Sequence, residues 1–406
     1  MGQTLRDEKS SLWRNQRAIA LLLAASLTTM ANATISPALA GLQTLFAGHP
    51  HSELLIPLLV SAPSLTVVLF APLAGFLTDR LGRRWMLLAG VLLFVVSGTA
   101  GSFLTDLDMI FGSRLVLGIA VAMVMTSQTA LVGDYFTGDK RVALTGLQVS
   151  ARNFGGFLFI SLAGWLAVFS PKLPFAIYGL AALFLPIMWI AIHEPIKSRN
   201  IAGHSIPAAN GGTSNWMLLI ALLTLLQMST NMLFFIMPTQ LPFFLDMLGY
   251  ESAVMTGVTL GALTLSGGFV ALTYGRIKRA LGFRATYAVA YGLMAIGFAS
   301  VSQGQELIFL IAGAVAIGAG FALAMPGFVA IALQLAPQNH RGIVGGALTT
   351  AIFLGQFLSP LITTPSISAL GYESTFFAAA LILAVLAAAA AINQGFNRYR
   401  QIRKTG

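Results

Sequence analysis

The feature that most limits how this chain can fold is a series of long apolar segments separated by short polar ones. A membrane-spanning helix needs about 20 predominantly apolar residues, and twelve segments of the chain meet that need. Only 9% of its 406 residues are charged, whereas a soluble domain carries about 25%. We therefore predict an integral membrane protein, with its apolar segments at about 18–45, 54–77, 85–104, 109–133, 142–168, 175–193, 216–245, 253–274, 285–303, 307–333, 342–368 and 374–395.

The apolar segments are rich in Ala, Leu and Gly and longer than the strands of a membrane β-barrel, which alternate over about 10 residues. We therefore predict an all-α membrane protein with twelve transmembrane helices. The chain contains no cysteine, which excludes disulfides, thiolate catalysis and cysteine-bound metals. We expect neither an enzyme nor a cofactor, because the segments hold no titratable constellation and no GxxxxGK[ST] phosphate-binding sequence occurs.

The basic residues are distributed unequally between the two sides of the membrane. If the N-terminus lies in the cytoplasm and the chain crosses twelve times, every basic residue except Lys172, Arg114 and Arg152 falls on the cytoplasmic side. Cytoplasmic loops carry an excess of Lys and Arg. The pattern predicts a multi-pass protein of the inner (cytoplasmic) membrane with both termini in the cytoplasm. It also accounts for the net charge of +10 without a nucleic-acid partner.

The two halves of the chain share a repeat at an offset of 200 residues. The matching pairs are Gly75 and Gly275, Gly82 and Gly282, Arg84 and Arg284, Gly118 and Gly318, Arg141 and Arg341, Gly146 and Gly346, and Gly155 and Gly355. Internal repeats are typical of secondary transporters, whose substrate site lies near the bilayer midplane between the repeats. We predict two pseudo-symmetric six-helix bundles, 1–193 and 216–406, joined by a polar linker at 194–215 in a monomeric protein.

Three short motifs resemble one known family. The sequence "GFLTDRLGRR" at 75–84 matches the loop between helices 2 and 3 of the major facilitator superfamily, through Gly75, Asp79, Arg80, Gly82, Arg83 and Arg84. Arg114 with Gly118 resembles the arginine motif of its fourth helix. The sequence "NATISPAL" at 32–39 is similar to the first-helix signature of its twelve-helix drug:proton antiporter branch.

This resemblance implies the major facilitator fold and a secondary transporter that works by alternating access. It also implies a latch, in which Asp79 pairs with nearby arginines and faces a helix N-terminus of the other half. Arg83, Asp134 and Arg141 would be its neighbours. The second copy of the loop has Arg279 in place of the acid. The alternative for Arg80, Arg83 and Arg84 is that they only set the topology.

The charged residues that lie inside the predicted helices are basic. All 13 acidic residues fall at helix ends or in loops, and Asn32 stands where antiporters of the resembling branch carry a proton-binding acid. Arg152 lies near the predicted midplane, and an arginine there suits a carboxylate or phosphate group. The alternatives are that Arg152 pairs with the backbone or with Asn153, and that Arg114 donates to helix carbonyls.

Uncharged polar residues in the predicted helices add a candidate lining for the substrate site. A single residue of this kind more often joins helices by hydrogen bonds than it contacts a substrate. We predict proton-coupled efflux of a small organic molecule, drug-like or a metabolite, by analogy with the resembling branch. The alternative is an anionic or zwitterionic metabolite held by a buried arginine. The candidate substrate-binding residues are Asn32, Thr34, Arg114, Gln128, Arg152, Asn153, Gln227, Asn231, Gln240 and Gln356.

Overall fold

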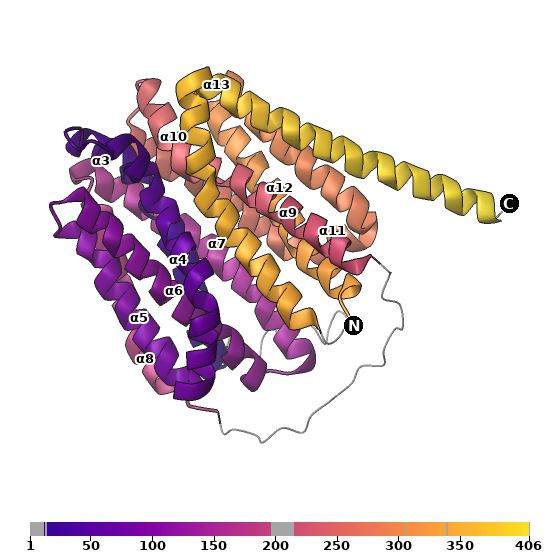
Figure 1. The fold of residues 1–406 in the computed structure, drawn as a ribbon, viewed down its shortest axis with the longest axis horizontal. Helices are drawn as coiled ribbons and strands as arrows, with labels where there is room; N and C mark the ends of the chain where they lie inside the picture. The colour runs from indigo at the N-terminus through magenta and orange to yellow at the C-terminus, as the bar shows by residue number, and fades with distance from the viewer. Residues whose placement is uncertain (1–11, 13, 196–214, 305, 338–339, 406) are drawn as a thin grey trace.

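The computed structural model describes residues 12, 14–195, 215–304, 306–337 and 340–405, and this part of the chain is entirely helical (Figure 1). The elements of the first half are α2 (Gln16–Ala33), η1 (Ser36–Ala38), α3 (Leu39–Leu45), α4 (Ser52–Leu81), α5 (Arg83–Thr99), η2 (Ala100–Ser102), α6 (Leu107–Tyr135), α7 (Gly138–Phe169), η3 (Leu173–Leu183) and α8 (Phe184–Ala191). Those of the second half are α9 (Trp216–Phe234), α10 (Ile236–Met247), α11 (Ser252–Gln303), α12 (Leu307–Leu335) and α13 (Arg341–Thr405).

Ten helical segments within the described residues are long and apolar enough to cross a membrane. Two of them, Ser252–Gln303 and Arg341–Ile392, each extend over 52 residues. A straight helix of that length measures about 78 Å, more than twice the roughly 30 Å of a hydrocarbon core. Each is interrupted by one non-helical glycine, Gly282 at φ 77° and Gly371 at φ 82°. These positive φ values are readily adopted only by glycine.

Polar side chains and glycines mark several helix ends. The Asn15 side chain accepts a hydrogen bond from the backbone N–H of Arg17 at 3.0 Å, which caps α2. Asp106 caps α6 in the same way through the N–H of Met109 at 3.0 Å. Side-chain oxygens at this position satisfy N–H groups that have no partner within the helix. Gly82, at φ 105°, separates α4 from α5 and forms the tight turn expected from the sequence.

The repeat predicted from the sequence recurs as the same contact in both halves. In the first half, Thr66 of α4 donates to the carbonyl of Leu115 on α6 at 2.8 Å. In the second half, Ser266 of α11 donates to the carbonyl of Val315 on α12 at 2.9 Å. Gly118 faces the first contact and Gly318 the second, and each leaves no room for a Cβ. The helices therefore approach closely at equivalent places.

Two helix pairs hold the halves of the chain together. α7 packs along α11, and α4 packs along α13; Figure 1 shows the indigo α4 beside the orange first part of α13. Between α7 and α11 the backbones nearly touch, because a Cβ on Gly164 would lie 2.8 Å from Cα of Gly257. α10 also contacts α3 and η1. The halves therefore meet along two helix pairs and again at α10.

One predicted helix differs from expectation in its local structure. The segment predicted at 175–193 begins as the 3-10 helix η3 and becomes α-helical only from Phe184. The aromatic side chains of Phe175 and Tyr178 on η3 are fully buried. They fill space that a Cβ on Gly101 or Gly98 would occupy. Close packing on these glycines fixes this segment.

Candidate functional site

A buried hydrogen-bonded group joins the two halves at mid-helix. The side-chain oxygen of Gln356 on α13 accepts from the Asn32 amide on α2 at 2.9 Å and from the Ser64 hydroxyl on α4 at 2.8 Å. All three side chains are buried. We call Asn32, Ser64 and Gln356 the amide node. The sequence predicted Asn32 and Gln356 for the site but missed Ser64, which carries no distinguishing signal in an apolar helix.

Further buried polar atoms along α2 and beyond its end lack hydrogen-bond partners. The side-chain oxygen of Asn32 is buried and unpaired, as is the hydroxyl of Thr34. Gln128 of α6 donates to the carbonyl of Leu21 on α2 at 3.2 Å, while its own oxygen has no partner. A buried polar group without a partner costs about 1–3 kcal/mol. These groups are therefore available to a polar ligand or to water.

α9 carries a second row of such groups. Thr224, Gln227 and Asn231 are spaced three and four residues apart and so share one face of the helix. Both amide atoms of Gln227 are unpaired although the residue is only 1% exposed. Asn231 donates to the carbonyl of Gln227 at 2.9 Å and contacts the Met325 sulfur at 3.6 Å, leaving its oxygen unpaired. The Thr224 hydroxyl, which sequence reasoning missed, is also unpaired.

Two of the predicted lining residues lie elsewhere. Gln240 donates to the hydroxyls of Thr363 at 3.2 Å and Thr364 at 3.0 Å, so its amide joins α10 to α13. Asn153 donates to the carbonyl of Val149 on its own helix at 2.9 Å. A Cβ on Gly267 would lie 3.0 Å from the Asn153 oxygen, which places Asn153 between α7 and α11. Both residues hold helices together, the role that single polar residues more often have.

Arg152 lies on the face of α7 that contacts other helices of the candidate site. It precedes Gly155 and Gly156 by three and four residues and shares their face. Gly155 packs on Ser26 of α2, and Gly156 on Thr29 of the same helix. The Arg152 Nε atom is buried without a hydrogen-bond partner. No ion pair to Arg152 occurs among the described residues, so neither Asn153 nor an acid neutralises it there.

Arg114 is enclosed within the first half instead. It is 0% exposed and donates to the carbonyl of Gly98 at 2.8 Å. Its guanidinium lies 4.9 Å from the Phe175 ring centroid and 4.7 Å from that of Tyr178. Aromatic faces attract a guanidinium. The contacts match the structural alternative for Arg114, a donor to a helix carbonyl, and separate it from the amide node.

The loop motif forms a small charge cluster at the ends of α4, α5 and α6. Arg83 lies 3.5 Å from Asp79 and 3.2 Å from Asp134. The Asp79 side chain is 75% exposed, and its one ion pair within the described residues is to Arg83 of the same half. Arg80 lies exposed over the Phe76 ring. In this conformation Asp79, Arg83 and Asp134 pair with each other, and no ion pair among the described residues joins them to the second half.

Three other latch candidates make few contacts. Arg141 lies near Gly133 and forms no ion pair with Asp134 in the described part of the chain. Arg84 donates to the carbonyl of Trp189 at 3.0 Å, which ties α5 to α8. Gly75 makes no close helix contact in this conformation. A Cβ on Gly75 would meet no atom within 4 Å.

Sequence reasoning missed Glu194, which it assigned to the linker. Its carboxylate accepts hydrogen bonds from the backbone N–H groups of Arg83 at 2.8 Å and Arg84 at 2.9 Å. These N–H groups form the start of α5, where a negative charge is favoured. A Cβ on Gly82 would lie 2.9 Å from this carboxylate. Only the three-dimensional fold brings residue 194 to the loop, so spacing along the chain gave no signal.

The described geometry agrees with what is known of similar proteins. A sequence model of the Major Facilitator Superfamily matches residues 21–360. The chain belongs to the major facilitator superfamily. It is a membrane transporter of this superfamily and not an enzyme.

Curated relatives of this superfamily member include drug-resistance proteins. Quinolone resistance protein NorA of Staphylococcus aureus (strain MRSA252) is 26% identical over 314 residues, which cover 75% of this chain and 79% of the relative. Multidrug resistance protein 1 of Bacillus subtilis (strain 168) is 26% identical over 318 residues, which cover 75% of this chain and 78% of the relative. The resemblance to the drug:proton antiporter branch therefore extends beyond the short motifs.

Solved superfamily structures share the fold. The D-xylose-proton symporter superposes with a TM-score of 0.70 at 17% identity, covering 91% of this chain and 96% of the other. The nucleoside transporter NupG superposes with a TM-score of 0.69 at 13% identity, covering 93% of this chain and 98% of the other. At these identities the likeness concerns the fold alone.

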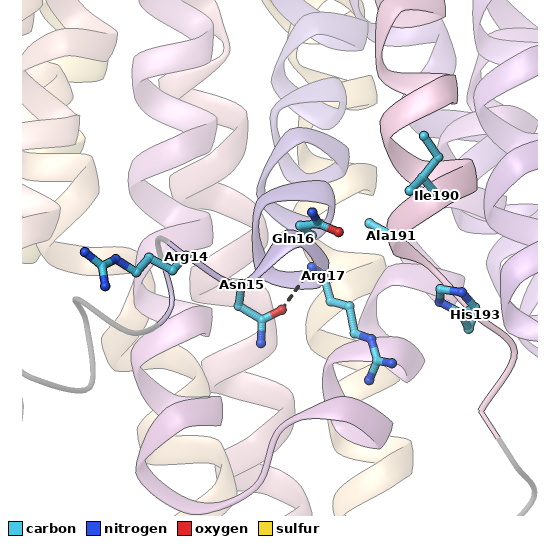
Figure 2. A pocket seen from close by; sticks show the side chains of 7 residues that line it. All are labelled: Arg14, Asn15, Gln16, Arg17, Ile190, Ala191 and His193. Atoms are coloured by element: carbon cyan, nitrogen blue, oxygen red, sulfur yellow. Dashed lines mark hydrogen bonds between the residues drawn. The ribbon is translucent and has the colours of Figure 1, made fainter.

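A cavity of about 490 Å³ lies away from the amide node, at the start of α2 and the end of α8 (Figure 2). Gln16 lies sixteen residues before Asn32 on α2, a distance of about 24 Å along a helix. The cavity is therefore separate from the candidate substrate site. Its lining, which the sequence did not single out, is Arg14, Asn15, Gln16, Arg17, Ile190, Ala191 and His193.

Proposed function

We propose that this transporter exports a small organic molecule, drug-like or a metabolite, by alternating access coupled to protons. The two curated relatives described above are named for quinolone and multidrug resistance, which supports an organic molecule as substrate. The resemblance to the drug:proton antiporter branch, which these relatives extend, supports coupling to protons. The protein acts as a monomer in this proposal, because the substrate site lies between the halves of one chain.

We propose twelve spans in two six-helix bundles. The non-helical glycines Gly282 and Gly371 would each divide a 52-residue segment into two spans, which raises the ten candidate segments to twelve. The first bundle is 1–193 and the second 216–406, with the linker at 194–215. Most of this linker lies outside the described residues. An even number of crossings and the basic residues together put both termini in the cytoplasm.

The observation that carries this proposal is the group of unpaired polar atoms between the halves. The amide node joins α2 and α4 to α13, and unpaired atoms of Asn32 and Gln227 lie on helices from both halves. A substrate there would contact both halves and would be released as they separate. The proposed substrate-binding residues that the geometry supports best are Asn32, Thr34, Gln128, Arg152, Gln227, Asn231 and Gln356.

The conformation of the structure corresponds to one end state of an alternating-access cycle. On the side predicted to be periplasmic, α10 contacts α3 and η1. On the opposite side, Cβ atoms on Gly146, Gly342 and Gly346 would meet nothing within 4 Å, and Asp79 forms no ion pair with the second half among the described residues. We infer that this conformation is open toward the cytoplasm. Asp79, Arg83, Asp134 and Arg141 would latch the halves in the other state.

A second candidate function follows from Arg152. An isolated arginine at the bilayer centre costs at least about 2.5–3.5 kcal/mol, and Arg152 has no acidic partner among the described residues. The anionic group of a substrate would offset that cost. The substrate would then be an organic acid, a siderophore-like chelate, an acidic sugar derivative or a zwitterion. The proton would be carried by that carboxylate or by a peripheral acid such as Asp79, Asp134 or Asp246.

Transport assays in proteoliposomes test both candidates. An imposed pH gradient should drive uptake of a zwitterionic quinolone and of a lipophilic cation in the main proposal, and dissipating the gradient should stop it. If no organic solute responds to the gradient, proton-coupled export is wrong. For the second candidate, Arg152→Ala should abolish transport of anionic solutes while Arg152→Lys keeps part of it. Unchanged anion transport by Arg152→Ala would exclude the arginine as the anion site.

A further inference from the structure

The cavity at the start of α2 is strongly basic. Arg17 at the start of α2 and His193 beyond the end of α8 lie on one side of it, the Arg14 guanidinium extends to the other side of α2 (Figure 2), and no acidic residue among the described residues lines it. Its volume of about 490 Å³ lies within the range of small-molecule sites, about 300–1,000 Å³. Arg14 and Arg17 are exposed. The described lining therefore carries two exposed positive charges without an acidic partner, and that of Arg17 faces an anionic ligand beside His193.

The neighbouring acids are turned away from the cavity. Glu194 follows His193 directly, but its carboxylate is bound to backbone N–H groups at the start of α5. Asp134 is bound to Arg83. The Arg17 guanidinium lies 4.8 Å from the Tyr135 ring centroid, a contact that orients a cation without neutralising it. The cavity thus keeps its positive charge although two carboxylates lie on adjoining elements.

The cavity also borders a surface that faces the membrane. Ile190, which lines it, is 67% exposed. The adjacent Trp189 is 53% exposed and packs edge-on against the equally exposed Trp85, with ring centroids 5.6 Å apart. Tryptophans gather where the apolar core of a bilayer meets the headgroups. The cavity therefore lies at headgroup level, on the side that the basic residues predict to be cytoplasmic.

We propose that this cavity binds the phosphate group of an anionic phospholipid from the cytoplasmic leaflet. Arg17 would hold the phosphate, His193 would contribute a hydrogen bond, Arg14 would add positive charge from the other side of α2, and Ile190 would contact the start of an acyl chain. Basic pockets between membrane helices on the cytoplasmic side suit anionic headgroups. This lipid site is independent of the transported molecule, because it lies about 24 Å along α2 from the amide node.

Titration of the purified full-length protein with short-chain phosphatidylglycerol tests this proposal. Each basic residue near an anionic membrane surface strengthens binding about fivefold. The double variant Arg14→Gln/Arg17→Gln should therefore bind phosphatidylglycerol about thirtyfold more weakly. The control variant Arg276→Gln/Arg279→Gln removes the same charge from the second half, outside the cavity, and should bind like the wild type. Equal thermal stability of both variants would show that the exposed substitutions leave the fold intact.

Three outcomes would overturn the lipid site. The first is unchanged binding of phosphatidylglycerol by the Arg14→Gln/Arg17→Gln variant, and the second is an equal loss in the control. The third is binding of phosphatidylcholine as tightly as of phosphatidylglycerol. A competition arm with inorganic phosphate separates the two sources of the phosphate group. If phosphate alone displaces the lipid at millimolar concentration, the cavity is a site for a soluble anion and the membrane assignment is wrong.

Discussion

Replacing Gly82 with alanine isolates the contribution of Glu194, because the repeat supplies a matched control in Gly282. Both glycines have backbone angles that other residues rarely adopt, φ 105° and ψ 144° for Gly82 and φ 77° and ψ 170° for Gly282. Such strain costs about 1–3 kcal/mol at each site. A Cβ at residue 282 meets nothing within 4 Å, whereas one at residue 82 lies 2.9 Å from the Glu194 carboxylate. The backbone strain therefore largely cancels in the comparison.

The remaining difference measures the carboxylate at the start of α5. Glu194 accepts two backbone hydrogen bonds, at 2.8 and 2.9 Å. An acidic group at an exposed helix N-terminus stabilises by about 0.3–1 kcal/mol, and a hydrogen bond adds about 1 kcal/mol net. Since Glu194 is exposed, solvent screening keeps the sum low. We expect Gly82→Ala to lower the free energy of unfolding by about 1–2 kcal/mol more than Gly282→Ala.

Reversible unfolding in mixed detergent and dodecyl sulfate measures these free energies. Glu194→Gln should destabilise the wild type but have almost no effect in the Gly82→Ala background, where the carboxylate is already displaced. The double variant therefore gives a coupling energy close to the whole effect of Glu194→Gln. Equal losses for Gly82→Ala and Gly282→Ala, or additive effects of Gly82→Ala and Glu194→Gln, would refute this account of the loop.

Three further substitutions follow from buried contacts. Arg114→Leu removes the donor to the Gly98 carbonyl and the contacts with two aromatic rings, and should destabilise the fold by about 1–3 kcal/mol, with a lower melting temperature and an unchanged KM in the surviving protein. Gln356→Leu leaves the Asn32 amide and the Ser64 hydroxyl without their acceptor, which should destabilise the cytoplasm-open state by about 1–3 kcal/mol. Inter-spin distance measurements should then show a shift away from that state. Gly118→Ala and Gly318→Ala should destabilise similarly in unfolding assays, because each Cβ would collide with a helix carbonyl; a loss at only one site would contradict the repeat.

The sequence predicted the helical membrane fold because hydrophobicity and charge act locally. Apolar length alone identified the helices, and glycine spacing identified the repeat whose contacts recur at Thr66 and Ser266. The loop motif located the ion pairs of Arg83. Each of these features depends on residues close together in the chain or on a constant offset.

The site was harder to predict because a helix that is apolar all round does not reveal which face is buried in protein. Arg114 and Arg152 are both arginines within predicted helices, yet one packs inside the first half and the other lies on a face beside α2. Ser64 and Glu194 bind partners that are distant in sequence. Such pairs follow from helix rotation and packing, which a single sequence does not specify.

The chemistry of the amide node suits a protein that changes between two conformations. A hydrogen bond between neutral groups contributes about 0.5–1.5 kcal/mol net, whereas separating a buried ion pair costs about 3–5 kcal/mol. Asn32, Ser64 and Gln356 join the halves with neutral groups only, so parting them leaves no charge exposed in the membrane. Two states within a few kcal/mol can be shifted by the differential affinity of a ligand. The ion pairs of Arg83 lie at the helix ends, where water is available to solvate them when they separate.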